Sequence, residues 1–422
     1  MTGSGKGPDA GVEDTPRSAM YIDMAYLHEI ITQRGQETFF QSRHSRGYFK
    51  RVWGVHPLAD IAGKTTSRIE TSHFSGHQII IEGAAYTEGW LKVLRPLELV
   101  VSQSKLFALL VRTIRDNNIS VIFSMDPLYG GLMGLLLRRI CRIPLIVSVY
   151  GNFDLAYATN KSLAMPKLLP SKRLQDLVTK FVLSRADLVI SGNRNNLEFA
   201  LEHGAEPATA VLLPAAKFVQ DCHFKCPSER AGADDVFTAL GLPPGRDCLL
   251  SVARLLGLKL VGDALRAMIE AIRRDSNIIG VFAGDGPMRG QLEAAVLAEG
   301  LSERIFFLGN VSQERLSELF PHCVTLSPLT GLALIEAGLG GSPTVAYDLE
   351  WQSEFIDDGV NGYLVPAGSY TAMANKALAI IHNPDVRAKF ASAIRQTALD
   401  FADPIKLAAN EKATFDRVLH VS

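Results

Sequence analysis

Short runs of consecutive hydrophobic residues alternate with stretches that have helical hydrophobic spacing, from about residue 20 onward. A strand buried on both faces carries no polar alternation, so such runs predict parallel strands covered by helices on both sides. Regular alternation of the two patterns predicts a doubly wound α/β architecture with right-handed crossovers. The predicted strands include residues 121–124, 145–149, 188–191, 248–252, 280–283, 305–308, 324–326 and 344–347.

The alternation breaks once, between about residues 221 and 246, where proline and glycine are frequent and periodicity is weak. Because 422 residues exceed one ordinary core, this break predicts a boundary between two domains. We therefore predict a flexible tail over 1–17, a first Rossmann-like domain over 18–225, a linker over 226–246, a second Rossmann-like domain over 247–400, and a C-terminal helix over 401–422 that packs back on the first domain.

Composition and charge narrow the possible partners. The formal net charge is −1, so the chain as a whole has no bias toward nucleic acid. The five cysteines are scattered and odd in number, which favours a reducing compartment over a disulfide framework. The chain shows neither the apolar core of a signal peptide nor an apolar run of about 18–20 residues. These features predict a cytoplasmic protein that does not cross a membrane.

Two cations follow the first predicted strand of the second domain. Arg254 comes just after that strand, and Lys259 lies five residues later. The carboxyl ends of parallel strands are where open α/β sheets bind ligands, and two cations there suit a diphosphate. The competing interpretation is a pair of solvated surface residues.

A glycine turn follows the next strand. Gly284 and Gly286 precede Pro287, which suits a helix start. The glycines permit a tight turn and close approach of a ligand. A dinucleotide-binding fingerprint is disfavoured, because Gly290 falls one position too late and the motif is not at the first crossover.

A third segment, residues 326–337, runs from a strand through Thr330, Gly331 and Leu332 into an apolar helix. Free amides at a helix start bind anions. Glu336 lies inside this mostly apolar helix, so its carboxylate needs a partner and suits a ribose diol. The competing interpretation is an ordinary surface or ion-paired glutamate.

These three segments occur in this order and are followed by 341–348 and 357–365. Together they resemble the retaining GT-B glycosyltransferases, in particular family 4, the glycosyl transferases group 1. The resemblance covers nearly all of 245–400 and extends more weakly to 126–131, 149–151 and 186–190. It implies the GT-B fold, with two Rossmann-like domains facing each other across a cleft.

The resemblance also implies roles for individual residues. Arg254 and Lys259 would hold the donor diphosphate and stabilise it as a leaving group. Glu336 would bind the donor ribose. The expected donor is a UDP- or GDP-linked sugar, transferred with retention and with neither a metal nor another cofactor. The remaining donor-site residues implied by the family are Gly284, Gly286, Asn310, Val311, Thr330, Gly331 and Leu332.

Two departures from the family pattern bear on catalysis. A second family glutamate, eight positions before Glu336, is replaced by Pro328. A histidine common in the first domain is replaced by Met125, and neighbouring Asp126 is a polar substitute. We therefore name Arg254, Lys259 and Asp126 as catalytic candidates. Two other functions stay open: a non-catalytic relative that binds sugar nucleotide, and a sugar-nucleotide epimerase of the same fold.

The first domain is expected to bind a glycan or lipid-linked acceptor, in surface polysaccharide or glycoconjugate biosynthesis. The basic, aromatic-rich stretch 43–56 suits a phosphate-bearing lipid or polyanionic glycan, or is a solvated loop; single-stranded nucleic acid is disfavoured. The basic stretch 161–185 has hydrophobic residues on one helical face. That face either packs on its own sheet or contacts an anionic membrane surface, which would make the protein peripheral on the inner face of a membrane.

Overall fold

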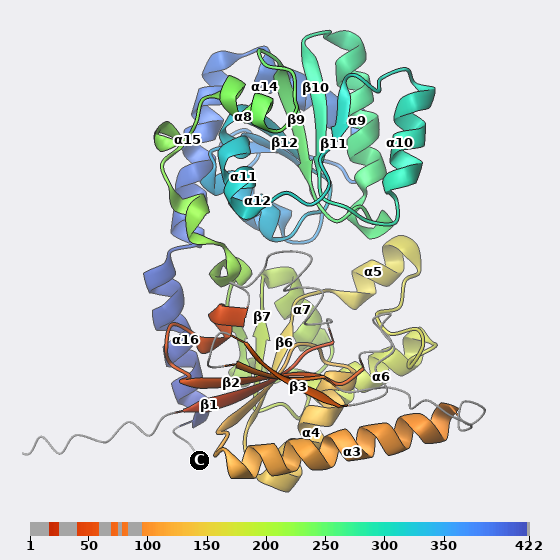
Figure 1. Ribbon diagram of the computed structural model, residues 1–422, viewed down its shortest axis with the longest axis vertical. Helices are drawn as coiled ribbons and strands as arrows, with labels where there is room; N and C mark the ends of the chain where they lie inside the picture. Colours follow the sequence, from red (N-terminus) through yellow and green to blue (C-terminus); the bar gives the residue numbers. More distant parts are fainter. Residues whose placement is uncertain (1–16, 25–39, 59–68, 75–77, 83–94, 420–422) are drawn as a thin grey trace, which may run out of the picture.

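A computed structural model describes residues 17–24, 40–58, 69–74, 78–82 and 95–419. The chain forms two lobes, one above the other in Figure 1, and each is built on a largely parallel sheet. The prediction of two doubly wound α/β domains is confirmed. Among the described residues, no helix combines the length and the apolar character that crossing a membrane requires.

The first lobe contains eight described strands, all parallel except β3 at the edge. Their spatial order is β3 (Glu70–Phe74), β4 (Gln78–Glu82), β2 (Arg51–His56), β1 (Ser18–Ile22), β5 (Val121–Ser124), β6 (Leu145–Val149), β7 (Leu188–Ser191) and β8 (Ala210–Leu212). The described helices of this lobe are α3 (Arg95–Asp116), α4 (Tyr129–Cys141), α5 (Phe153–Asn160), α6 (Lys172–Leu183) and α7 (Arg194–Glu202).

The second lobe contains six parallel strands in the order of a Rossmann sheet. The spatial order is β11 (Ile305–Phe307), β10 (Ile278–Ala283), β9 (Asp247–Val252), β12 (Cys323–Ser327), β13 (Thr344–Tyr347) and β14 (Gly362–Val365). The chain winds outward in both directions from the β9–β12 pair, which is therefore the switch point. The helices are α8 (Ala233–Ala239), α9 (Val261–Arg274), α10 (Arg289–Ala298), α11 (Gln313–Leu319), α12 (Leu332–Leu339), α13 (Gln352–Phe355), α14 (Tyr370–Ile381) and α15 (Pro384–Phe401).

The central strands are buried along their whole length, as their continuous hydrophobic runs predict. Strands β5, β6, β10 and β12 are buried at every position. Each sheet therefore separates two hydrophobic clusters, and helices cover both faces. All eight strands that the hydrophobic runs predicted are present, with ends that shift by a residue or two.

The interpretation of residues 43–56 as a basic surface patch, or as a solvated loop with a few packed aromatics, is wrong for much of the segment, although Arg46, Lys50 and Arg51 are exposed. Arg51–His56 form β2, between β1 and β4. Trp53 is buried, and Arg43 is buried with a 2.5 Å ion pair to Asp23. The aromatic and histidine side chains of this segment mainly fill the core, so the basic composition is no evidence of a polyanion site.

The expected linker, 226–246, contains α8. Val236 and Phe237 of this helix are buried in the cluster that covers one face of the second sheet, with Leu250 and Phe320. The helix therefore packs with the second lobe. Short 3-10 helices connect the lobes ahead of it: Ala215–Phe218, Asp221–Phe224 and Pro227–Glu229.

The final helix, α16 (Pro404–Leu419), lies on the first lobe after the chain crosses back from α15 (Figure 1). Its Phe415 is fully buried in a cluster with Tyr21 and Phe49 of the first lobe. Lys217 and Glu411 form a 2.5 Å ion pair that attaches the helix to the start of the connection between the lobes. The chain thus crosses between the lobes twice, and both crossings contact the first lobe.

Phe415→Ala tests the contribution of this helix. Removing a fully buried phenylalanine leaves a cavity, so the first lobe should lose about 3–5 kcal/mol of unfolding free energy. Ile405→Ala, on the same helix at a side chain that is 78% exposed, should be close to neutral. Thermal denaturation of both variants checks this, and equal melting temperatures would contradict it.

Candidate active site

A pocket of about 580 Å³ lies at the carboxyl ends of β9, β10 and β12, at the switch point of the second sheet. Parallel strands end at the same edge, so segments far apart in sequence meet there. All ten donor-site residues named from the sequence line this pocket: Arg254, Lys259, Gly284, Gly286, Asn310, Val311, Thr330, Gly331, Leu332 and Glu336.

The positive wall of the pocket consists of Arg254, just after β9, and Lys259, at the end of the 3-10 helix Gly257–Lys259. Burial lowers the pKa of Lys259; Glu350 opposes this shift, and the charge of Arg254 adds to it. Within the described part of the chain, neither cation has a carboxylate at ion-pair distance. Lys259 is therefore a partly desolvated cation without an ion pair, and the exposed Arg254 adds a second positive charge, so this wall favours an anionic ligand.

The turn after β10 contains two glycines at positions where any side chain would clash with the backbone of a neighbouring segment. Gly284 has φ +136°, and a methyl group on it would lie 2.0 Å from the carbonyl oxygen of Ala253. A methyl group on Gly286 would lie 2.6 Å from the carbonyl oxygen of Leu255. The glycines therefore let the β10 turn pack directly against the segment that carries Arg254, and so fix the place of that cation.

The loop between β12 and α12 is held from behind by a buried side chain, Gln352. Its Nε2 donates to the carbonyl oxygens of Pro328 (2.9 Å) and Tyr347 (3.0 Å), while its Oε1 accepts from the Ser327 hydroxyl at 2.5 Å. Trp351 Nε1 donates to the carbonyl oxygen of Thr330 at 3.2 Å. These bonds orient the loop that leads to the free amides at the start of α12.

Glu336 is buried and has no hydrogen bond within the part of the chain that the structure describes. Burial raises its pKa to about 7. Its nearest basic neighbour is His223 from the interlobe connection, with Nε2 at 4.0 Å from Glu336 Oε1. A buried carboxylate that faces a pocket without a partner suits hydroxyl donors from a ligand.

Sequence reasoning missed His223 and Gln313 as parts of this wall. His223 Nε2 and Gln313 Oε1 are 2.7 Å apart, and Gln313 lines the pocket. Burial lowers the pKa of His223 to about 4, so its ring is neutral at neutral pH. Because His223 lies in a segment without periodicity, no sequence pattern connects it with α12.

The third catalytic candidate, Asp126, lies in the other lobe and does not line the pocket. It follows β5, beside the β1–β5 pair from which the first sheet winds outward. Its Oδ1 accepts from the amides of Leu128 (2.8 Å) and Gly130 (3.2 Å), and its buried Oδ2 has no hydrogen-bond partner among the described residues. Burial raises its pKa to about 7, against the effect of those amides. Asp126 therefore both shapes the start of α4 and keeps one unpaired carboxylate oxygen.

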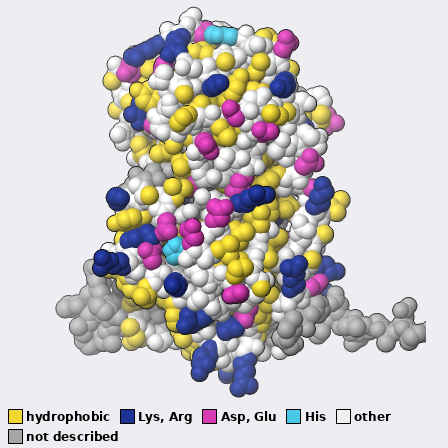
Figure 2. Space-filling view, turned by 180° about the vertical axis from the view of Figure 1, so that it is seen from behind, with side chains coloured by type: hydrophobic (Ala, Val, Ile, Leu, Met, Phe, Trp, Pro, Cys, Tyr) yellow, Lys and Arg dark blue, Asp and Glu magenta, His cyan; other side chains and the backbone are white. Residues whose placement is uncertain are grey.

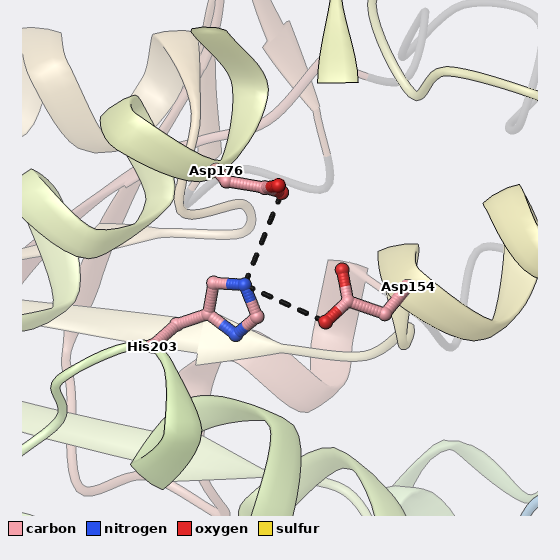
Figure 3. A group of neighbouring side chains, drawn as sticks. All are labelled: Asp154, Asp176 and His203. Atoms are coloured by element: carbon pink, nitrogen blue, oxygen red, sulfur yellow. Dashed lines mark ion pairs between the residues drawn. The ribbon is translucent and has the colours of Figure 1, made fainter. Parts of the chain in front are cut away.

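A second cluster of polar groups, Asp154, Asp176 and His203, has distances that suit a metal ion (Figure 3). His203 Nε2 lies 3.6 Å from Asp154 and 3.9 Å from Asp176. The ammonium of Lys172 contacts both carboxylates as well. Since the ammonium of Lys172 already pairs with both acids, we interpret the cluster as an ion-pair network that ties α5, α6 and α7 together.

Two facing doubly wound lobes, with a ligand pocket at the switch point of the second, define the GT-B class of α/β proteins. Solved structures agree with this architecture. Anabaena HepE, solved with UDP and glucose, matches with a TM-score of 0.70 at 17% identity, over 95% of this chain and 100% of that one. WaaG, a glycosyltransferase involved in lipopolysaccharide biosynthesis, matches with a TM-score of 0.66 at 14% identity, over 95% and 99%.

Family models then specify the class. The model for glycosyl transferases group 1 matches residues 233–397, and the glycosyl transferase 4-like domain matches residues 84–216. The chain belongs to the group 1 glycosyltransferases of GT-B fold.

Curated relatives are similar over part of their length. The D-inositol 3-phosphate glycosyltransferase of Nocardia farcinica is 29% identical over 249 residues, which are 56% of this chain and 53% of that protein. The alpha-D-kanosaminyltransferase of Streptomyces kanamyceticus is 30% identical over 172 residues, 39% and 41% of the two chains. The chain thus spans about half the length of these relatives or less.

Glu336→Gln tests the burial of this carboxyl group. Its pKa rises from 4.5 to about 7 on folding, so the buried carboxyl group is tolerated while it is protonated. The folded state therefore keeps its full stability below pH 4.5 and loses stability as the pH rises through 7. The unfolding free energy of the wild type relative to the Gln variant should therefore fall by about 3 kcal/mol between pH 4.5 and 8. Urea unfolding at both pH values measures it. Glu314→Gln, at an exposed carboxyl, is the control, and a pH-independent difference for position 336 would contradict the assignment.

Proposed function

We propose that this protein transfers a sugar from a UDP- or GDP-linked donor to a glycan or lipid-linked acceptor. One observation carries the proposal: among the described residues, a pocket at a sheet switch point combines two cations that form no ion pair with a buried carboxyl group that has no hydrogen bond. A nucleoside diphosphate sugar satisfies both, since its diphosphate pairs with Arg254 and Lys259 while its ribose hydroxyls donate to Glu336.

The relatives support this class of donor and acceptor. HepE was solved with UDP and with UDP-glucose. The poly(ribitol-phosphate) alpha-N-acetylglucosaminyltransferase of Staphylococcus aureus, 25% identical over 153 residues, acts on a polymer acceptor by its name. For the present chain, a polysaccharide or glycoconjugate pathway on the cytoplasmic side of a membrane is the corresponding proposal.

The proposed chemistry retains the anomeric configuration. The bond between the sugar C1 and the diphosphate oxygen breaks, and the acceptor oxygen bonds to C1 on the same face. The acceptor proton passes to the leaving diphosphate. Arg254, Lys259 and the amides at Gly331 and Leu332 stabilise the charge that develops there, in place of a metal ion. Asp126, with one unpaired oxygen in the facing lobe, would orient the acceptor hydroxyl.

A non-catalytic protein that binds sugar nucleotide is the second candidate, and Pro328 favours it. The family glutamate at this position normally faces the transferred sugar, whereas Pro328 offers only a carbonyl that Gln352 already occupies. A binding protein would hold the donor without turnover. Transfer or donor hydrolysis, measured with the donor that binds, separates the two functions.

Thermal-shift screening with nucleotide sugars tests the donor assignment. UDP- or GDP-sugars should raise the melting temperature most, because ligand binding stabilises the folded state by mass action. Arg254→Ala and Lys259→Ala should each lower kcat/KM about 100-fold, by analogy with the loss of an oxyanion donor. Arg273→Ala, at an exposed cation of the same lobe, is the control. No shift with any nucleotide sugar would overturn the donor assignment.

We also propose that α6 contacts an anionic membrane. Val178 and Val182 pack inward, whereas Leu174, Leu177 and Phe181 are 40%, 67% and 44% exposed. Exposed Arg173, Lys180 and Arg185 flank them, and the one acid of α6, Asp176, is paired with Lys172. Lysines and arginines also gather at the lower end of this lobe in Figure 2. An exposed apolar row with cationic flanks matches an anionic bilayer.

Co-sedimentation with phosphatidylglycerol vesicles tests the membrane contact. Leu177→Glu should reduce binding strongly, since it places a negative charge in the apolar row. Leu297→Glu changes an equally exposed leucine (71%) on the second lobe and should leave binding unchanged. Salt should weaken wild-type binding. Equal binding by the two variants, or none by the wild type, would refute the contact.

A further inference from the structure

One carboxylate of the second lobe caps a helix of the first lobe. Glu354 lies on α13, and its Oε2 accepts from the backbone amide of Arg194 at 2.9 Å while its Oε1 accepts from that of Asn195 at 3.1 Å. Both amides belong to the first turn of α7. We propose that Glu354 is a positioning residue that latches the two lobes together over the donor pocket.

The bonding partners make this contact favourable and specific. First-turn amides of a helix have no partner within the helix, and the helix dipole favours a negative charge there. The side chain of the α7 N-cap, Asn193, accepts from the amide of Asn196. Glu354 therefore satisfies the two amides that the first lobe leaves unpaired at this helix start. Since the carboxylate and the amides belong to different lobes, the bonds exist only while the lobes are closed at this point.

The latch is directly connected to the loop of the donor pocket. Glu354 is two residues after Gln352, which is fully buried and holds Ser327 and Pro328. Trp351 precedes both and holds the carbonyl of Thr330. One short segment, 351–354, therefore contacts both the first lobe and the loop that leads to the α12 amides. Closure of the lobes and the position of that loop are consequently coupled.

The two lobes also contact each other at a second place, as expected if they are closed over the pocket. Helix α5 of the first lobe touches the 3-10 helix Gly257–Lys259, which carries one of the two pocket cations. The lobes thus meet at the 3-10 helix that carries Lys259 as well as at Glu354. A latch that favours the closed form raises the population in which the facing lobe lies against the donor. This consequence for donor binding rests on the proposed function; the latch itself does not.

Small-angle scattering of the protein without nucleotide tests the latch directly. Glu354→Gln keeps the shape of the side chain but removes its charge and one of its two acceptors, so the variant should have a larger radius of gyration than the wild type. Glu293→Gln is the matched control, because this carboxylate pairs with Arg289 on its own helix and not across the lobes in the described part of the chain. An unchanged radius of gyration in Glu354→Gln would overturn the proposal.

Substitution on the other lobe separates the backbone contact from side-chain effects. Arg194→Pro removes one of the two donating amides, and proline is well tolerated at the first position of a helix. Asn193 is already extended, as the residue before a proline requires. Arg194→Ala keeps the amide and should scatter like the wild type. In the Glu354→Gln background, Arg194→Pro should add little further expansion; full additivity of the two effects would contradict a shared contact.

Titration with UDP gives an independent readout. Glu354→Gln should weaken UDP binding by about two- to tenfold, the range expected for a charge at a helix N-terminus, while Arg194→Ala should leave it unchanged. Unweakened binding in Glu354→Gln would overturn the coupling to the pocket. If the wild type bound neither UDP nor, in a parallel titration, GDP, the donor assignment would fail, and scattering alone would decide the latch.

Discussion

The arrangement of the second lobe depends on positive charge that no ion pair among the described residues neutralises. Lys259 is largely removed from water beside Arg254, and their mutual repulsion adds to the cost of its burial. Proteins rarely keep such a pair unless a ligand compensates it. Gly284 and Gly286 are needed to pack the neighbouring turn against the segment that carries Arg254, and Gln352 orients the opposite loop. The architecture around the switch point thus holds an anion site in place.

The same pocket also holds a carboxyl group that has no hydrogen-bond partner among the described residues. Glu336 lies on α12 with its carboxyl group buried, and this burial raises its pKa to about 7. Cations at one side and a carboxylate at another require a ligand that is anionic in one part and a hydroxyl donor in another. This division of charge, more than the volume of the pocket, supports a nucleoside diphosphate sugar.

Much of this site could be predicted because it depends on short, contiguous motifs at strand ends. Arg254, Gly284, Gly331 and Glu336 each follow a strand with a clear hydrophobic run, and the parallel sheet brings such ends together. His223 could not be found in this way, since it approaches Glu336 from an aperiodic connection through tertiary packing alone. For residues 43–56, tertiary structure overrides composition. The basic composition predicted a surface segment, but the pairing of β2 with β1 and β4 and the ion pair of Arg43 with Asp23 bury much of this segment.

The relation between the lobes lay beyond sequence reasoning as well. Glu354 and the α7 amides are separated by about 160 positions in the chain, and no local pattern links a carboxylate to amides of another lobe.

A crystal structure with UDP bound tests the central claim most directly. We predict diphosphate oxygens at about 2.7–3.0 Å from Lys259 Nζ and the Arg254 guanidinium, with ribose hydroxyls on Glu336. UDP bound elsewhere, with both cations still unpaired, would contradict it.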